Sequence, residues 1–72
     1  MQRISTESTA LIAIGYEDIT QRLQIEFQDG RIYEYSDVPA VVHRALLSSA
    51  SKGRFFNTCI RGHFRFAVAK NA

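Results

Sequence analysis

The chain has 72 residues, the size of one domain, and its 46% hydrophobic content with three tyrosines and five phenylalanines excludes general disorder. Its apolar runs are too short to span a bilayer, and a domain of this size hardly encloses a deep substrate pocket, so we expect neither a membrane protein nor an enzyme. The net charge of +2 conceals an asymmetry, because all seven carboxylates lie before residue 38, whereas six of the nine lysines and arginines lie after it.

The first half of the chain predicts three antiparallel strands. Residues 10–16 form an apolar and aromatic run that a polar turn follows. Residues 23–28 alternate between apolar and polar side chains, which is the pattern of a half-buried strand. Asp29-Gly30 predicts a tight hairpin with a type I′ turn, and residues 31–35 predict the next strand. Together these segments predict a three-stranded antiparallel meander.

The second half predicts two short helices and a final short strand. Pro39 suits the first position of a helix, because its missing N–H costs nothing there. Ser51 is expected to cap the second helix, and Gly62 is expected to end it. Residues 64–68 alternate again and predict the last strand. The order of elements favours an α+β fold, in which the two short helices pack on one face of the meander.

The segment 51–57 has the highest density of groups that can bind a phosphate. Lys52 and Arg54 flank Gly53 at a predicted helix start, where backbone N–H groups and the helix dipole favour an anion. The alternative is that the glycine eases a turn, that the cations are solvated and that a phenylalanine of the segment belongs to the core. The segment lacks the P-loop pattern.

Cations continue after this segment. Lysines and arginines that share one surface form an electropositive patch, for which nucleic acid is the usual partner. The alternative is that they pair with carboxylates of the sheet such as Glu26 and Glu34. Exposed pairs contribute only about 0–1 kcal/mol each, so the cations would still be available to a ligand. The candidate nucleic-acid-binding residues are Lys52, Arg54, Asn57, Arg61 and Arg65.

Tyr33 and Tyr35 lie on one face of the third predicted strand, together with Arg31. If that face is exposed, the two rings can stack on bases, as in proteins that bind single strands. If it faces the helices, the rings belong to the core, and Glu34 points outward, where it can pair with an arginine. The sequence leaves both interpretations open.

The single cysteine and the two histidines predict little chemistry. They are too few and too scattered for a zinc site, so we expect no metal and no cofactor. We expect Cys59 to pack as a small hydrophobic residue and His43 to be a surface or packing residue. No carboxylate after His63 could orient it toward Cys59 as a nucleophile pair. One cysteine and no apolar leader segment fit a cytoplasmic protein.

Two motifs point to a known family. Tyr33-Glu34-Tyr35 in the third predicted strand and the run Ser-Lys-Gly-Arg-Phe-Phe-Asn at 51–57, in this order, resemble the KTSC domain family. This is a small domain found at the C-terminus of some lysyl-tRNA synthetases and as a stand-alone bacterial or phage protein. The resemblance covers about residues 8–66 and implies one KTSC-like domain over 1–72, with its core at about 8–68.

This chain departs from the family pattern at two places. It has Phe55 where a tyrosine is frequent, which removes a hydroxyl, and it has Arg65 where the family often has a proline between two aromatic residues. The synthetase context implies RNA binding by association.

Two functional hypotheses follow. The first is a small, non-enzymatic nucleic-acid-binding module with RNA as its expected ligand, acting through a basic helical surface. The alternative is a protein-interaction module or a phage or prophage accessory protein, in which the same basic face or a sheet edge binds an acidic partner or a second copy of the chain. The sequence does not decide between RNA and protein partners, or between a monomer and a homodimer.

Overall fold

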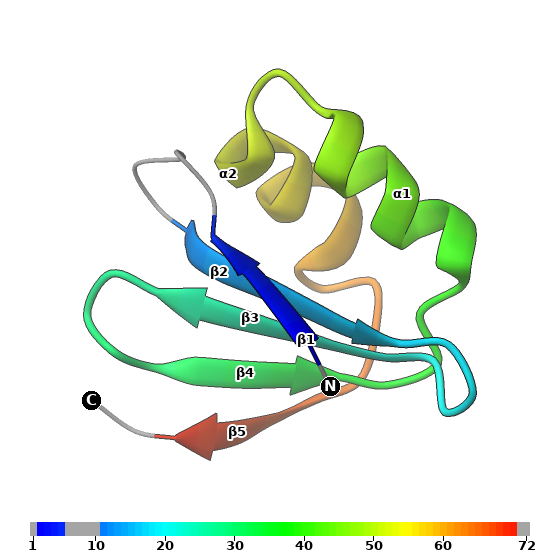
Figure 1. Cartoon of the computed structure of the whole chain (residues 1–72), viewed down its shortest axis with the longest axis horizontal. Coiled ribbons are helices and arrows are strands. Elements are labelled where there is room, and N and C mark those ends of the chain that lie inside the picture. Colours follow the sequence, from blue (N-terminus) through cyan, green and yellow to red (C-terminus); the bar gives the residue numbers. More distant parts are fainter. Residues whose placement is uncertain (1, 6–10, 71–72) are drawn as a thin grey trace.

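The computed structural model describes residues 2–5 and 11–70. They form a five-stranded antiparallel sheet with its strands in chain order and a helical layer over one face (Figure 1). The predicted α+β fold is therefore confirmed. The elements are β1 (Gln2–Ser5), β2 (Leu11–Glu17), β3 (Arg22–Phe27), β4 (Ile32–Tyr35), α1 (Ala40–Ser48), α2 (Lys52–Phe55), the π-helix η1 (Phe56–Ile60) and β5 (Phe66–Lys70).

The predicted meander corresponds to β2, β3 and β4, and the predicted final strand corresponds to β5. β5 extends the meander by pairing with β4, which places Phe66 opposite Tyr35 and Val68 opposite Tyr33. β1, which pairs with β2, was not predicted. Its four residues hold a single large apolar residue, so the sequence there has too little alternation to indicate a strand.

The turn of the β3–β4 hairpin differs from the predicted type I′. Gly30 has a φ of 92°, but Asp29 is not among the residues with positive φ. The Gly30 N–H donates to the Phe27 carbonyl at 3.0 Å, as in a three-residue loop that ends in a left-handed glycine. The Asp29 carboxylate instead accepts the Arg31 N–H at 3.0 Å. The type I′ prediction is wrong, because only one residue of the pair takes a left-handed conformation.

The helical segments begin and end close to their predicted limits. Pro39, predicted as the first helical residue, has an extended backbone with ψ of 149° and occupies the N-cap of α1, so the helix begins one residue later, at Ala40. The Ser51 Oγ accepts the Arg54 N–H at 3.3 Å and so caps α2, as predicted. Gly62, with φ of 81°, follows the last helical turn, which confirms the predicted stop.

The core lies between the sheet and the helices. Its central members come from three strands, from the β4–α1 connection and from two helical segments: Leu11, Ile14, Leu23, Ile25, Tyr35, Val38, Leu46, Phe56 and Ile60. On the opposite face of the sheet, the Glu34 carboxylate lies 3.7 Å from the Arg22 guanidinium and accepts a hydrogen bond from the Gln24 amide at 3.2 Å. Glu34 therefore points away from the helices and pairs with an arginine of the acidic half.

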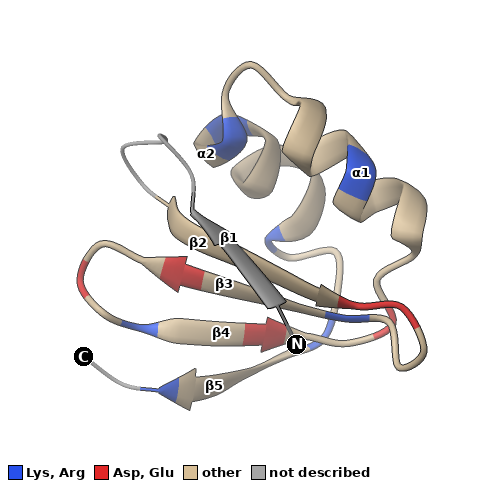
Figure 2. Cartoon of the chain, viewed as in Figure 1, with Lys and Arg blue, Asp and Glu red and all other residues tan. Residues whose placement is uncertain are grey.

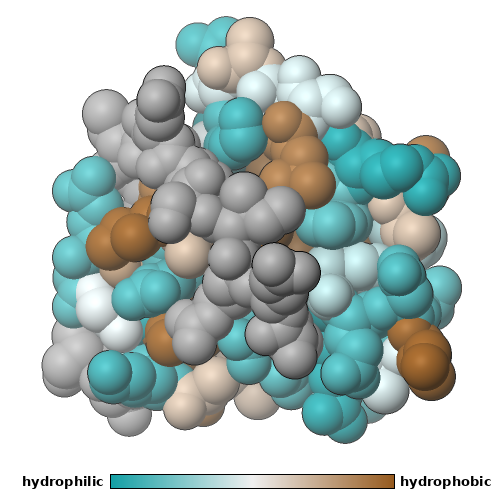
Figure 3. Space-filling view, viewed as in Figure 1, coloured by the Kyte–Doolittle hydropathy of each residue, from teal (hydrophilic) through white to brown (hydrophobic). Residues whose placement is uncertain are grey.

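Few large hydrophobic side chains are exposed on the described part of the surface. On the face in Figure 3, the described hydrophobic residues form separate small patches among hydrophilic ones, which is ordinary for a protein surface. Two of the exposed large hydrophobic side chains, Phe66 and Val68, are neighbours on β5. None of the described helices is both long enough and apolar enough to cross a bilayer.

Replacing Ser51 by alanine is expected to lower the free energy of unfolding by about 1 kcal/mol, because a backbone N–H in the first turn of α2 loses its partner. Urea denaturation measures this change. Ser48→Ala is the matched control, since Ser48 is exposed within α1 and alanine favours helix. Equal losses in the two variants would contradict the role of Ser51 as a cap.

Candidate nucleic-acid interface

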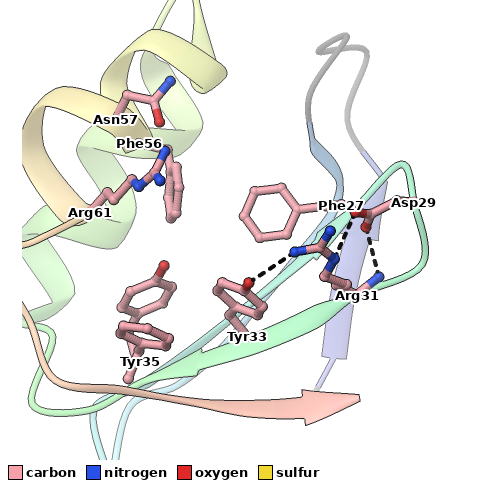
Figure 4. Close-up of a pocket in the computed structure, with 9 residues that line it drawn as sticks. Phe27, Asp29, Arg31, Tyr33, Tyr35, Phe56, Asn57 and Arg61 are labelled. Carbon is pink, nitrogen blue, oxygen red and sulfur yellow. Dashed lines mark hydrogen bonds and ion pairs between the residues drawn. The ribbon is translucent and has the colours of Figure 1, made fainter. Parts of the chain in front are cut away.

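A cleft with a volume of about 330 Å³ lies between η1 and the part of the sheet formed by β4, β5 and the β3–β4 hairpin. In Figure 4, Asn57 and Arg61 lie on the helical side of the cleft, and Asp29 and Arg31 lie on the hairpin beyond the rings. The cleft therefore joins segments that are distant in the chain. Its lining residues are Phe27, Asp29, Arg31, Tyr33, Tyr35, Phe56, Asn57, Arg61 and Phe66.

Five aromatic rings of the cleft form a closed circuit, in which the centroids of successive rings are 5.3 to 5.6 Å apart. The circuit runs through Phe27, Tyr33, Phe66, Tyr35 and Phe56 and back to Phe27. Tyr33 and Phe66 stack with 16° between their planes, whereas both contacts of Phe27 are edge-to-face. Each such pair contributes about 0.5–1.5 kcal/mol beyond its burial, so the rings hold one another in place.

The two tyrosines of β4 face the helices, which confirms the core interpretation for Tyr35. Its side chain is 2% exposed, and within the described residues its hydroxyl has no protein partner. No fully buried side-chain oxygen in the described part lacks a partner, so this hydroxyl must reach the open space of the cleft, as Figure 4 shows. Tyr33 is half-buried and presents its ring to the cleft.

The ionisation of Tyr35 reflects this position. Burial, reinforced by the neighbouring Tyr33, raises the pKa of Tyr35 to about 12, although the nearby Arg61 acts in the opposite direction. At neutral pH the hydroxyl is therefore protonated and can donate a hydrogen bond to a ligand.

The same pKa predicts a loss of stability in alkali. A tyrosine in the unfolded chain ionises near pH 10, whereas Tyr35 in the folded chain ionises at about 12. The contribution of Tyr35 is therefore complete below pH 10 and falls as the pH rises toward 12, because the unfolded state releases its proton first. Urea denaturation at about pH 9 and about pH 11 measures how much the free energy of unfolding falls between the two pH values. This fall is expected to be smaller for Tyr35→Phe than for the unchanged chain. An identical pH dependence would contradict this.

Two guanidinium groups line the cleft, and their environments differ. The Arg31 Nε lies 2.8 Å from the Asp29 carboxylate, and Arg31 also donates to the Tyr33 hydroxyl at 3.5 Å. These contacts raise the pKa of Arg31, with the hydrogen bond to Tyr33 as the largest cause. Arg61, at the end of η1, has no ion pair or side-chain hydrogen bond within the described residues. Its charge is thus available to a ligand.

The other predicted site residues lie outside this cleft. Arg54 lines a second, more open cleft of about 350 Å³ near the end of α1. The Lys52 ammonium donates to the Ser49 carbonyl at 3.3 Å and so satisfies the C-terminal end of α1. Arg65 is exposed just before β5. Figure 2 shows the cationic segments spread over both helices and the sheet.

The structure therefore brings together only some of the candidate residues. Asn57 and Arg61 share the aromatic cleft with Tyr33 and Tyr35. Phe27 and Phe66 were not recognised as site residues, although alternation along their strands places them on the face of the tyrosines.

Cys59 is exposed, so the prediction that it packs as a small hydrophobic residue is wrong. The reason is the wide turn of η1, in which Phe56 and Ile60 are buried and the three residues between them are exposed. His43 packs on Tyr16, with ring centroids 4.5 Å apart, and burial lowers the pKa of His43. His43 is therefore a packing residue.

Comparison with known proteins identifies the family. The model of the KTSC domain matches residues 7–64. This chain belongs to the KTSC domain family. The crystal structure of a KTSC domain protein from Yersinia pestis has a TM-score of 0.91 and 36% identity, covering 96% of this chain and 97% of that one. The resemblance seen in the sequence is thereby confirmed.

The KTSC domain occurs both alone and within a larger protein. A protein from Stutzerimonas stutzeri (strain A1501), described as uncharacterized, is 39% identical over 67 residues, which cover 92% of this chain and 94% of that protein. A lysine–tRNA ligase from Nostoc punctiforme is 41% identical over 63 residues, which cover 88% of this chain but 11% of the ligase. This KTSC domain thus corresponds to a small part of the ligase.

Proposed function

We propose that this KTSC domain is an RNA-binding module that holds single-stranded RNA across the aromatic cleft. The observation that carries the proposal is the circuit of five rings beside Arg61, whose charge has no protein partner among the described residues. Proteins that bind single strands combine such stacking surfaces with cations that follow the backbone. RNA is the favoured nucleic acid, since a similar domain forms part of a protein named for its action on tRNA.

The candidate residues have unequal roles in this proposal. Arg61 contacts a backbone phosphate, and Asn57 beside it hydrogen-bonds the bound segment. Arg54 and Arg65 lie away from the cleft and strengthen the attraction at longer range, which salt screens readily. Lys52 contributes least, because its ammonium is already bonded to the end of α1.

Fluorescence anisotropy with a labelled single-stranded RNA tests the proposal. Neutralisation of three phosphates by Arg54, Arg61 and Arg65 together predicts that affinity falls roughly tenfold to twentyfold between about 50 mM and about 200 mM salt. A hairpin of matched composition with a fully paired stem is expected to bind more weakly, because its stem exposes no base faces. Absence of RNA binding at the lower salt concentration would overturn the function.

One observation favours a second candidate, a protein-interaction module. β5 is an edge of the sheet, all five of its residues are exposed, and Phe66 and Val68 are 53% and 45% exposed. An exposed edge strand can pair with a strand of another chain, here a second copy of this one. Light scattering after size exclusion would then give a dimer that Val68→Lys dissociates. A monomer at high protein concentration would contradict this candidate.

A further inference from the structure

We propose that the aromatic cleft is a pocket for one unpaired nucleotide, with its base against the rings and its phosphate on Arg61. This inference rests on the proposed RNA-binding function and adds to it the unit that is recognised. The domain would bind RNA where a nucleotide is free of pairing, at an end, in a loop or at a bulge.

The size and the exposure of the cleft fit one nucleotide. Its volume of about 330 Å³ lies at the small end of the range of about 300–1,000 Å³ for ligand sites. Tyr35 and Phe56, at 2% and 4% exposure, form the floor. Phe66 is 53% exposed, and Phe27 and Tyr33 are half-buried, so these three rings offer accessible surface. A base can therefore pack on the outer rings, while the inner pair keeps them in position.

The polar groups of the cleft are mostly hydrogen-bond donors. The Tyr35 hydroxyl and the Arg61 guanidinium have no protein partner within the described residues, and the Tyr33 hydroxyl accepts from Arg31, which leaves its proton to donate. The Asp29 carboxylate is engaged by Arg31. Donors match a phosphate, which is a pure acceptor when ionised, and they match the carbonyl oxygens and ring nitrogens of bases.

The charge of the cleft favours a nucleotide over a cationic ligand. Aromatic cages also bind quaternary ammonium groups. Among the described residues, however, two guanidinium groups and a single carboxylate line the cleft, so the formal charge of this lining is positive. An ammonium ligand would be repelled, whereas a nucleotide monophosphate would be attracted.

A base can enter the cleft only when it is unpaired. The accessible rings lie between the hairpin and η1, and in a duplex the faces of a base are covered by its stacked neighbours. Nucleic-acid enzymes that read one base in a pocket take it out of the stack for the same reason.

Titration of the whole chain with each nucleoside 5′-monophosphate, followed by ¹⁵N–¹H NMR, tests the inference. Stacking of one base with one phosphate contact predicts a dissociation constant on the order of 1 mM, within reach of NMR. The resonances that shift should belong to the residues that line the cleft. The nucleoside and ribose 5-phosphate, which each lack one part of the ligand, are expected to bind about tenfold more weakly.

Two variants assign the parts of the ligand to the two sides of the cleft. Arg61→Gln is expected to weaken binding of the monophosphate about tenfold and to leave the affinity for the nucleoside unchanged, because only the phosphate contact is lost. Phe66→Ala is expected to weaken binding of the monophosphate and of the nucleoside by about tenfold each, because a stacking surface is lost. Arg44→Gln and Val41→Ala, at exposed positions of α1, are the matched controls and should change neither.

The outcomes separate this inference from the proposed function. If single-stranded RNA binds while monophosphates cause no shifts in the cleft, the pocket is overturned and the RNA function stands. Tighter binding of choline than of the monophosphates also overturns it. If monophosphates bind in the cleft but RNA does not bind, the pocket is supported and the RNA function fails.

Discussion

Reversing the charge of Arg61 (Arg61→Glu) is expected to reduce the affinity for single-stranded RNA at least tenfold at low salt, because a phosphate contact is replaced by a repulsion. The milder Arg61→Gln should lower the slope of log affinity against log salt concentration by about 0.7, the value for one phosphate contact on a single strand. Anisotropy titrations over a series of salt concentrations measure both effects. Circular dichroism should be unchanged, since Arg61 is exposed and makes no ion pair or side-chain hydrogen bond within the described chain that its loss would break.

Arg44→Glu is the matched control for this prediction. Arg44 is exposed on α1 and does not line the cleft, and its reversal changes the net charge by the same amount. If the two reversals weaken binding equally, RNA responds only to overall charge, and the assignment to the cleft is wrong. Arg54→Glu should give an intermediate loss, because Arg54 lies on a different cleft of the same helical segment.

The structure shows how some of the carboxylates in the acidic half of the chain are paired. Two carboxylates of the acidic half pair with arginines of the same half, Glu34 with Arg22 and Asp29 with Arg31. These pairs are local to the β3–β4 hairpin and its neighbouring strand ends, so they do not neutralise the cations that follow residue 38. Arg61, which the sequence could only place in a list of four cations, has no ion pair within the described residues and is available to an anion from outside.

Local patterns predicted most of the fold. An apolar and aromatic run located β2, alternation located β3, and the Asp29-Gly30 turn located β4 after it. The cap at Ser51 and the glycine at 62 located the helical segment between these two residues. The direction of Tyr33 and Tyr35 needed tertiary information, because alternation divides a strand into two faces without saying which one the helices cover. The wide turn of η1 also depends on packing, since it is Phe56 and Ile60 that are buried there.

The cleft itself could not be predicted from local patterns. Its ring circuit depends on the register of β5 against β4, which places Phe66 opposite Tyr35. It depends equally on η1, which brings Phe56 against Phe27 and Tyr35. These contacts join residues 21 to 31 positions apart, and neither the period of a strand nor the period of a helix specifies such contacts.

Phe56 belongs both to the core and to the cleft, and two substitutions are expected to separate these roles. Phe56→Ala should lower the free energy of unfolding by about 3–5 kcal/mol, because a ring that is 4% exposed leaves a cavity. A chain of 72 residues has a total stability of roughly 4–11 kcal/mol, so this variant should be partly or wholly unfolded at room temperature. Phe56→Leu keeps an apolar side chain in the space and should cost less than about 1.5 kcal/mol, provided that its neighbours repack.

The leucine variant then isolates the contribution of the ring to binding. It should remain folded by circular dichroism, yet bind single-stranded RNA several-fold more weakly, because Phe27 and Tyr35 lose the ring that fixes their orientation. Leu46→Ala is the control, since Leu46 is fully buried and does not line the cleft. It should lower stability by about 2–5 kcal/mol while the fraction of molecules that remains folded binds RNA with unchanged affinity. If Phe56→Leu instead binds like the unchanged chain, the ring circuit serves the core alone, and RNA must be held by the cations without stacking.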